Sequence, residues 1–389
     1  MQGRFLALAA LALAACGREA PPPGTSSDPK PVLVRIGHAG PLTGSIAHQG
    51  KDDENGVALA IDQANAKHMV IGGKRVVFSM MSEDDQGDPK TGTTVAQKLV
   101  DAHVAAVVGH LNSGVTIPAS EIYSKAGIPV ISGSATSPEL TERGLKGVFR
   151  TIGRDDQQGP AIAAYMARDL GAVKAAVVDD KTAYGDGLAT EVEKALRAAG
   201  VKIVGREHTT DKETDFKSIL TRIKAKAPDA VFHGGMDATG GLMLKQAREL
   251  GVKAAFAFGD GACTEEMAAL AGPAGEGLAC SQAGLPAASA SKEFRDAFRA
   301  RYGDTKLYAA YFYDATNVII DAMKRADSID PAKFGPKLYE TKLAGATGPI
   351  EFDAKGDRKN AEMTLFRMKD GKITPVAIYR EGRLEPFGG

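Results

Sequence analysis

Hydroxyl-bearing side chains occur in two loops that each follow a short apolar stretch and precede a helical pattern. The first loop contains Ser113, and the second contains Ser134 and Thr136. Backbone N–H groups at the start of a helix, together with serine and threonine hydroxyls, form a receptor for a carboxylate or another anion. The alternative is that these hydroxyls only cap the helices that follow them.

An acidic residue, Asp260, lies between Gly259 and Gly261 after another apolar stretch. Glycine on both sides permits a tight turn from which the carboxylate projects. A carboxylate that faces anion-binding loops suits a zwitterion such as an amino acid. The seven histidines are scattered and form no HExxH or Cys–His grouping, so the sequence predicts neither a metal site nor a cofactor.

The elements that must position these residues alternate along the chain. Short apolar runs at residues 104–108, 174–178, 229–232 and 254–258 predict strands, and stretches between them have apolar residues at helical spacing. This pattern predicts an α/β fold with parallel sheets covered by helices on both faces. In such sheets, ligands bind beyond the carboxyl ends of the strands, where the polar loops lie.

Two runs of this pattern predict two Rossmann-like lobes. The last elements of the chain are too short for a third lobe, so we expect them to return and complete the first two. We predict an N-terminal lobe of residues 32–153 and 284–362, and a C-terminal lobe of residues 154–283 and 363–380. Several crossing segments would then form a hinge between the lobes.

The first sixteen residues have the pattern of an export signal. Arg4 precedes an apolar run that is too short to span a bilayer, and residues 13–16 (LAAC) are similar to a lipobox. This predicts a protein outside the cytoplasm that is anchored to the membrane by a lipid on Cys16. The alternative is an ordinary secretory signal with an incidental cysteine. Residues 17–31, rich in Pro, Gly and Ser, predict a flexible tether.

The remaining cysteines, Cys263 and Cys280, are seventeen positions apart. Two leftover thiols in an oxidising compartment tend to form a disulfide, and two buried free thiols are the alternative. Charge excludes other classes of partner. Lys+Arg and Asp+Glu both number 48, and no basic block is present. This balance argues against nucleic acid as a partner and against a polybasic membrane-binding surface.

Several stretches of the chain, in order and at similar spacing, resemble the branched-chain amino-acid (leucine/isoleucine/valine) binding proteins that serve ABC transporters. Those proteins have the type I periplasmic binding protein fold. The stretches are residues 109–120 (GHLNSGVTIPAS), 134–144 (SATSPELTERG), 180–189 (DKTAYGDGLA), 234–235, 246–251 (QARELG), 259–261 and 348–356 (GPIEFDAKG). The resemblance implies a monomeric receptor that closes on a small amino acid and delivers it to the permease subunits.

The resemblance also implies roles for single residues. Ser113 would offer its N–H and hydroxyl to the ligand carboxylate, and Thr136 would do the same while helping to hold the ammonium. The carbonyl of Ser134 would accept a hydrogen bond from the ammonium, with Ala135 beside it in the binding loop. Asp260 would neutralise the ammonium charge, because charge-assisted contacts are strong in a desolvated cleft.

Apolar and aromatic residues would surround the ligand side chain. By the same resemblance, Tyr184 would form one wall of the pocket, with Leu111 opposite and Tyr313 near it. For Tyr184 the alternative is an aromatic residue that only caps a turn. For Tyr313 the alternative is packing within a helix.

The chain departs from the family pattern at three points. Gly87 and Asn112 stand where enteric members of the family form a disulfide, so the resemblance implies a first lobe without that bridge. Met236 stands where a tyrosine normally flanks the ammonium, and Gln49 replaces an aromatic residue near the mouth of the pocket. Loss of a ring removes a cation–π attraction of about 1 kcal/mol. We expect Asp237, next to Met236, to point to solvent; the alternative is that it compensates for the lost ring.

Two other classes of function are compatible with parts of this sequence. A serine hydrolase would use Ser113 with His110, but the chain has no G-x-S-x-G elbow. We therefore predict that the protein is not an enzyme. A ligand-sensing regulatory module for a small amide or carboxylate would share the fold, but the predicted lipobox favours a transport protein.

Overall fold

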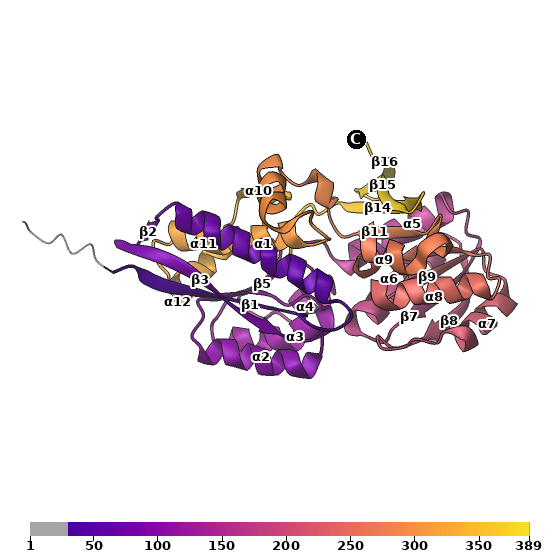
Figure 1. The fold of residues 1–389 in the computed structure, drawn as a ribbon, viewed down its shortest axis with the longest axis horizontal. Coiled ribbons are helices and arrows are strands. Elements are labelled where there is room, and N and C mark those ends of the chain that lie inside the picture. The colour runs from indigo at the N-terminus through magenta and orange to yellow at the C-terminus, as the bar shows by residue number, and fades with distance from the viewer. Residues whose placement is uncertain (1–29, 389) are drawn as a thin grey trace, which may run out of the picture. The chain divides into compact units, whose positions relative to one another are not determined.

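The computed structural model describes residues 30–388, so the predicted signal segment, Cys16 and most of the tether lie outside the described residues. Within residues 30–388 the strands form two large sheets and one two-stranded ribbon, and helices cover the sheets (Figure 1). The predicted α/β fold with two lobes is confirmed. No helix in this range combines the length and apolar character needed to cross a membrane.

The first sheet has the strand order β2-β3-β1-β4-β5-β6, and all of its neighbouring strands are parallel except β2 and β3. Its strands are β1 (Val32–Gly40), β2 (Val70–Ile71), β3 (Lys74–Asp84), β4 (Ala106–Gly109), β5 (Val130–Ser132) and β6 (Val148–Arg150). Strands β4 to β6 are buried along their whole length, which explains their continuous apolar sequences.

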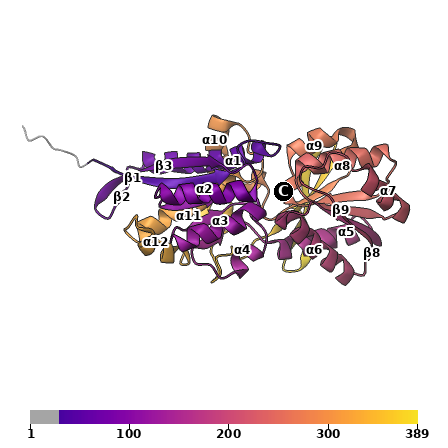
Figure 2. The same cartoon turned by 90° about the horizontal axis from the view of Figure 1, so that it is seen from below.

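Helices from both ends of the chain complete the first lobe. They are α1 (Ala47–Ala66), α2 (Pro89–Asp101), α3 (Ser113–Lys125), α4 (Glu139–Glu142), α10 (Lys292–Tyr302), α11 (Ala309–Arg325) and α12 (Pro331–Leu338). Helix α11 packs against α1 and against β4 and β5, so the orange helices of Figures 1 and 2 lie among indigo and purple elements. The ribbon of β12 (Leu343–Gly345) and β13 (Gly348–Ile350) follows α12.

The second sheet has the strand order β16-β15-β14-β11-β10-β9-β7-β8. Its strands are β7 (Lys174–Asp179), β8 (Lys202–His208), β9 (Ala230–Gly234), β10 (Ala255–Phe258), β11 (Ala279–Gln282), β14 (Met363–Lys369), β15 (Lys372–Arg380) and β16 (Arg383–Pro386). Its helices are α5 (Asp155–Arg168), α6 (Ala183–Ala198), α7 (Lys217–Lys226), α8 (Asp237–Glu249) and α9 (Glu265–Ala271), with short 3₁₀ turns η1 (Asp260–Ala262), η2 (Gly272–Gly275) and η3 (Ala287–Ser289).

Strand direction in the second sheet differs from the prediction of parallel sheets. Strands β7 to β11 are parallel, but β14, β15 and β16 join as antiparallel neighbours. For β15 and β16 the reason is local. Two-residue loops at Asp370-Gly371 and Glu381-Gly382 have positive φ at both positions, which is the geometry of a tight hairpin turn. A hairpin reverses the chain and makes the next strand antiparallel.

The chain passes between the sheets three times, after β6, after β11 and before β14. The passing segments bind one another. The N–H of Gly153 donates to the carbonyl of Ala283 at 2.8 Å, and the Thr364 hydroxyl donates to the carbonyl of Gly284 at 2.7 Å. These contacts place the segments side by side, as the predicted hinge of several strands requires.

Candidate functional site

The two hydroxyl-rich loops of the first lobe bind each other. Ser113 opens α3, and the amide N–H of Ser137 donates to its Oγ at 3.2 Å. The Ser134 hydroxyl donates to the carbonyl of Leu111 at 2.9 Å. Asn112 precedes α3, and its Oδ1 is buried without a partner among residues 30–388. The start of α3 therefore has no side-chain cap, as an anion-binding helix terminus requires.

A buried arginine fixes the second loop. Arg150 is fully buried, and its Nη1 donates to the carbonyl of Ala135 at 2.6 Å. Its Nε donates to Oδ1 of Asp357 at 2.6 Å, and its Nη2 donates to the Thr141 hydroxyl at 3.0 Å. The N–H of Ala135 donates to the Ser132 hydroxyl at 2.9 Å. Both backbone groups of Ala135 are thus used inside the protein. Ala135 thus holds the loop in place through both of its backbone groups, and its predicted contact with a ligand stays a prediction.

Asp260 lies at the carboxyl end of β10, on η1, and is 1% exposed. Its Oδ1 accepts from Tyr184 Oη at 2.8 Å and from Gln158 Nε2 at 3.1 Å, and its Oδ2 accepts from Tyr308 Oη at 2.7 Å. Burial raises the pKa of Asp260 above its ordinary value, and these three donors partly oppose the rise. Asp260 is therefore a buried acid held in one orientation by uncharged groups.

A second buried acid, Asp155, connects Asp260 to the hydroxyl loops. The N–H of Asp155 donates to the carbonyl of Thr136 at 2.9 Å, and its Oδ1 lies 3.4 Å from the same Gln158 amide that contacts Asp260. Burial, followed by the charge of Asp260, raises the pKa of Asp155 well above its ordinary value. Ser113, Thr136 and Asp260 thus belong to one connected cluster.

Two polar atoms of this cluster remain unsatisfied. The Thr136 hydroxyl lies close enough to Asp155 to lower its pKa in part. Even so, Thr136 Oγ1 and Asp155 Oδ2 make no hydrogen bond with proper geometry to any described residue. Buried polar atoms are rarely left without a partner, so unpaired atoms of this kind commonly mark a place for a ligand or a water.

Tyr184 and Met236 surround Asp260 in the second lobe. The Thr182 hydroxyl caps α6 by accepting from the N–H of Gly185 at 2.9 Å, which places Tyr184 in the first turn. The Tyr184 hydroxyl accepts from the N–H of Gly261 at 2.9 Å while donating to Asp260. A Cβ at Gly261 would lie 2.5 Å from the sulfur of Met236, so a larger residue there would displace the methionine side chain. Tyr184 thus contacts Asp260 directly and does not serve only as a cap.

A cleft of about 530 Å³ opens beside Tyr184 and Met236, and Ser113, Thr136 and Asp260 are not among the residues that line it. Residues of both lobes line it, among them Asn112, Gly114, Tyr184, Met236 and Ala238. Leu111 is buried behind the first loop, with 2% of its surface exposed. The cleft thus borders the predicted side-chain wall at Tyr184 and Met236.

Asp237 does not point to solvent, contrary to the prediction. It is fully buried, and its Oδ2 accepts from the Thr264 hydroxyl at 2.6 Å. From the other lobe, His48 Nε2 lies 2.8 Å from this oxygen, and Gln49 Nε2 donates to it at 3.1 Å. Gln49 also donates to the carbonyl of Gly261 at 3.1 Å. Gln49 is therefore a buried bridge next to Asp260 and does not line an open mouth.

Tyr313 lies away from the site. Its hydroxyl donates to Oε1 of Gln63 at 2.6 Å, and its ring packs on Phe294 with a centroid distance of 5.0 Å. Tyr308, five residues earlier, is the tyrosine that contacts Asp260. Five residues of helix rotate a side chain to a different face, so only one of the two tyrosines faces the site. The tyrosines of residues 308–313 predicted an aromatic residue at the site, but the sequence did not distinguish Tyr308 from Tyr313.

Gln158 and Asp155 were missed by the sequence analysis. Both lie in the first turn of α5, directly after the chain passes from the first sheet. An acidic residue at a helix start is common for reasons unrelated to binding, because it favours the helix dipole. The only usable signal was the position of this turn between the two lobes.

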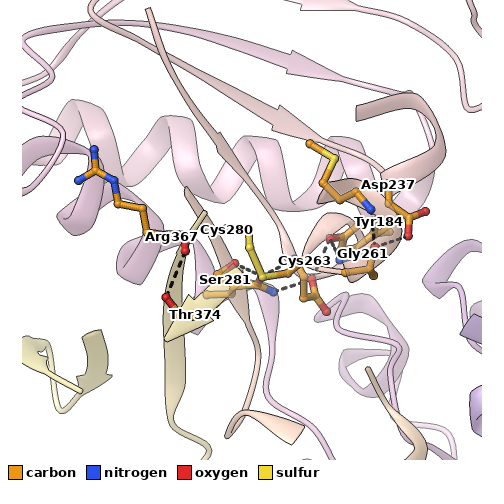
Figure 3. The surroundings of a disulfide bond; sticks show 12 residues. Tyr184, Asp237, Gly261, Cys263, Cys280, Ser281, Arg367 and Thr374 are labelled. Atoms are coloured by element: carbon orange, nitrogen blue, oxygen red, sulfur yellow. Dashed lines mark hydrogen bonds between the residues drawn. A yellow bond between two sulfur atoms is a disulfide. The ribbon is translucent and has the colours of Figure 1, made fainter. Parts of the chain in front are cut away.

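The two cysteines of the described residues are paired. Cys263 and Cys280 form a disulfide with 5.4 Å between their Cα atoms, and Figure 3 shows Tyr184, Gly261 and Asp237 gathered on one side of it.

His110, the histidine that a serine hydrolase would use, has other partners. Its two ring nitrogens bind Asp85 at 2.7 Å and the Tyr123 hydroxyl at 3.0 Å. His110 therefore does not serve as a base for Ser113.

Comparisons with known proteins agree with this fold. The family model described as periplasmic binding protein matches residues 33–372. The leucine-, isoleucine-, valine-, threonine-, and alanine-binding protein of Pseudomonas aeruginosa is 36% identical over 349 residues, covering 88% of this chain and 92% of the relative.

Two solved structures are also similar. The leucine binding protein LivK of Thermotoga maritima has a TM-score of 0.83 at 26% identity, covering 90% of this chain and 99% of that chain. The second is the branched-chain amino acid transporter substrate binding protein LivJ of Streptococcus pneumoniae, in complex with isoleucine. Its TM-score is 0.78 at 29% identity, and the match covers 88% of this chain and 97% of that chain. The matched residues include strands of both sheets.

Proposed function

Because the chain belongs to the periplasmic binding protein family, we propose that it is the extracytoplasmic substrate-binding component of an ABC transporter. Its ligand is a small amino acid, with branched-chain side chains the leading class. The relative from Pseudomonas aeruginosa, named for binding leucine, isoleucine, valine, threonine and alanine, supports this class. The observation that carries the proposal is the connected cluster of hydroxyl loops and buried acids described above.

The cluster supplies the two kinds of partner that a zwitterion needs. Ser113 and the uncapped start of α3 provide donors for the ligand carboxylate. Asp260 and the unpaired Oδ2 of Asp155 provide acceptors for the ammonium. Such charge-assisted hydrogen bonds are strong in a buried site, where neither charge could remain without a partner.

Binding couples to a movement of the lobes. Ser113 and Thr136 belong to the first lobe, whereas Tyr184, Met236 and Asp260 belong to the second. A ligand that contacts both sets stabilises the closed form only by the contacts that the open form lacks. The three passing segments provide the hinge. We place the lobe boundaries at these segments, near residues 153, 284 and 363.

Calorimetry and thermal shift measurements with leucine, isoleucine, valine, alanine and threonine test the proposal. A ligand at 100 times its dissociation constant adds about 2.7 kcal/mol to the free energy of unfolding. N-acetylleucine lacks the ammonium and leucinamide lacks the carboxylate, so we expect neither to bind. A protein that none of these amino acids stabilises, or that binds the blocked compounds equally well, would contradict the proposal.

We also propose that the protein is anchored to the membrane through a lipid on Cys16 and meets the permease subunits as a monomer. The LAAC tetrapeptide at residues 13–16 supports the anchor. Incorporation of labelled palmitate into the wild-type protein, and its loss in the Cys16→Ser variant, is the expected result. Equal labelling of both proteins would disprove anchoring at Cys16.

A further inference from the structure

The start of helix α1 contacts the start of helix α8. Helix α1 packs on β1 and β3 of the first sheet, whereas α8 packs with α7 and α9 in the second lobe. His48 and Gln49, in the first turn of α1, both reach Oδ2 of Asp237, the first residue of α8. These contacts therefore join the two lobes directly.

Asp237 is held in place by its own lobe. Its Oδ2 accepts from the Thr264 hydroxyl at 2.6 Å, and its Oδ1 accepts from the N–H of Ala238 at 2.8 Å. Only the contacts from His48 and Gln49 come from the other lobe. Gln49 adds a third contact across the lobes, to the carbonyl of Gly261 at 3.1 Å. Separation of the lobes would break these three contacts and leave the contacts of Asp237 with Thr264 and Ala238 intact.

We propose that His48, Gln49 and Asp237 form a latch that favours the closed form of this protein before any ligand binds. The inference rests on the proposed function, because it assumes that the lobes open and close. A protein whose binding-competent form is more populated binds its ligand with higher apparent affinity. The latch residues thus tune affinity as positioning residues, through the closing equilibrium.

The charges around His48 give the latch a dependence on pH. His48 faces Asp237 at the start of α8, Glu266 on α9 and Lys306 in the segment before α11. The hydrogen bond to Asp237 is the largest influence and raises the pKa of His48 above its ordinary value. The protonated ring therefore stabilises the closed form fully below the ordinary histidine pKa, and this stabilisation is lost as the pH rises through the raised pKa of His48.

Small-angle X-ray scattering of the ligand-free protein, stripped of bound ligand by reversible unfolding, tests the latch. We expect a smaller radius of gyration in mildly acidic than in alkaline solution. The His48→Ala variant should have a larger radius in acid and no difference between the two. We also expect its dissociation constant for a bound amino acid to rise about two- to fivefold, mainly through faster dissociation, as for a partly exposed ion pair.

The matched control is His208→Ala. Nδ1 of His208 lies 2.9 Å from Asp179, but both residues belong to the second lobe. This variant should keep the wild-type radius and its pH difference. A wild-type radius equal to that of His48→Ala under both conditions would overturn the latch. The scattering measurement uses no amino acid, so a failure of the proposed ligand class leaves its outcome interpretable.

Discussion

The hydroxyl of Tyr308, in the segment that opens α11, donates a 2.7 Å hydrogen bond to Oδ2 of Asp260 in the other lobe. Burial raises the pKa of Tyr308 well above its ordinary value, so the tyrosine stays protonated and remains a donor. Asp260 also accepts from Tyr184 and Gln158. The carboxylate is thus oriented by neutral groups, and an ammonium would meet an acceptor that is already in position.

Removal of the Asp260 carboxylate should weaken amino-acid binding. We expect Asp260→Ala to raise the dissociation constant about tenfold or more, because a hydrogen bond to a charged group is lost in a buried site. Asp260→Asn keeps the size of the side chain and should weaken binding too. Calorimetry provides the measurement. The control is Asp211→Ala, which removes an exposed acid that lines the cleft. Unchanged affinity in both Asp260 variants would remove Asp260 from the site.

Binding of an amino acid should release protons in mildly acidic solution. Burial raises the pKa values of Asp155 and Asp260 in the ligand-free protein. An ammonium between them favours the charged carboxylates and lowers these pKa values, so protons leave on binding. Calorimetry in buffers with different ionisation enthalpies counts these protons. The Asp155→Asn variant should release fewer, and equal enthalpies in all buffers for the wild type would count against the prediction.

Asp53, on α1, should make the stability of the protein fall as the pH rises. It is fully buried, and neither carboxylate oxygen has a hydrogen-bond partner within residues 30–388. Burial raises its pKa well above the ordinary value, so the folded state holds a proton that the unfolded state has lost. Stability is highest below the ordinary aspartate pKa and decreases as the pH rises toward the raised one.

The Asp53→Asn variant should therefore melt at a higher temperature than the wild type at neutral pH. We expect a gain of about 1–2 °C, the shift that roughly 1 kcal/mol produces when an unfolding entropy of about 2 cal/mol/K per residue is summed over a chain of this size. Melting curves at acidic and neutral pH would show a smaller dependence on pH in the variant. An unaltered pH dependence would mean that another group is responsible.

The disulfide between Cys263 and Cys280 should stabilise the second lobe. The bridge closes a loop of 17 positions, for which the loss of chain entropy in the unfolded state predicts about 3 kcal/mol. Urea unfolding of the Cys263→Ser, Cys280→Ser double variant should show this loss. A reducing agent should destabilise the wild type by a similar amount and leave the double variant unaffected. Equal stability of the two proteins would contradict this account.

Loss of Arg150 should both destabilise the protein and weaken ligand binding. Arg150→Met leaves the buried Asp357 with fewer partners and releases the carbonyl of Ala135. Breaking one side of a buried ion pair costs about 3–5 kcal/mol. The control Arg325→Met removes a more exposed pair with Asp321 and should change stability little. Thermal unfolding and calorimetry report the two effects separately, and a variant as stable as the wild type would refute this role.

The sequence by itself determined the fold class and the position of several site residues along the chain. Continuous apolar runs, helical spacing and glycines are local signals, and they predicted strands and helices that the structure contains. The glycines beside Asp260 are an example. Added Cβ atoms at Gly259 and Gly261 would lie 2.5 Å from the Tyr184 hydroxyl and from the Met236 sulfur, so the local pattern reflects a real close approach.

Only the tertiary structure decided which side chains meet. Tyr308 instead of Tyr313 faces Asp260, because the rotation of α11 sets the face that each residue occupies. Gln49 and Asp237 meet because two lobes approach each other, although 188 positions separate them along the chain. Contacts at such separations depend on how packed elements are oriented, and no local pattern of residue types encodes that orientation.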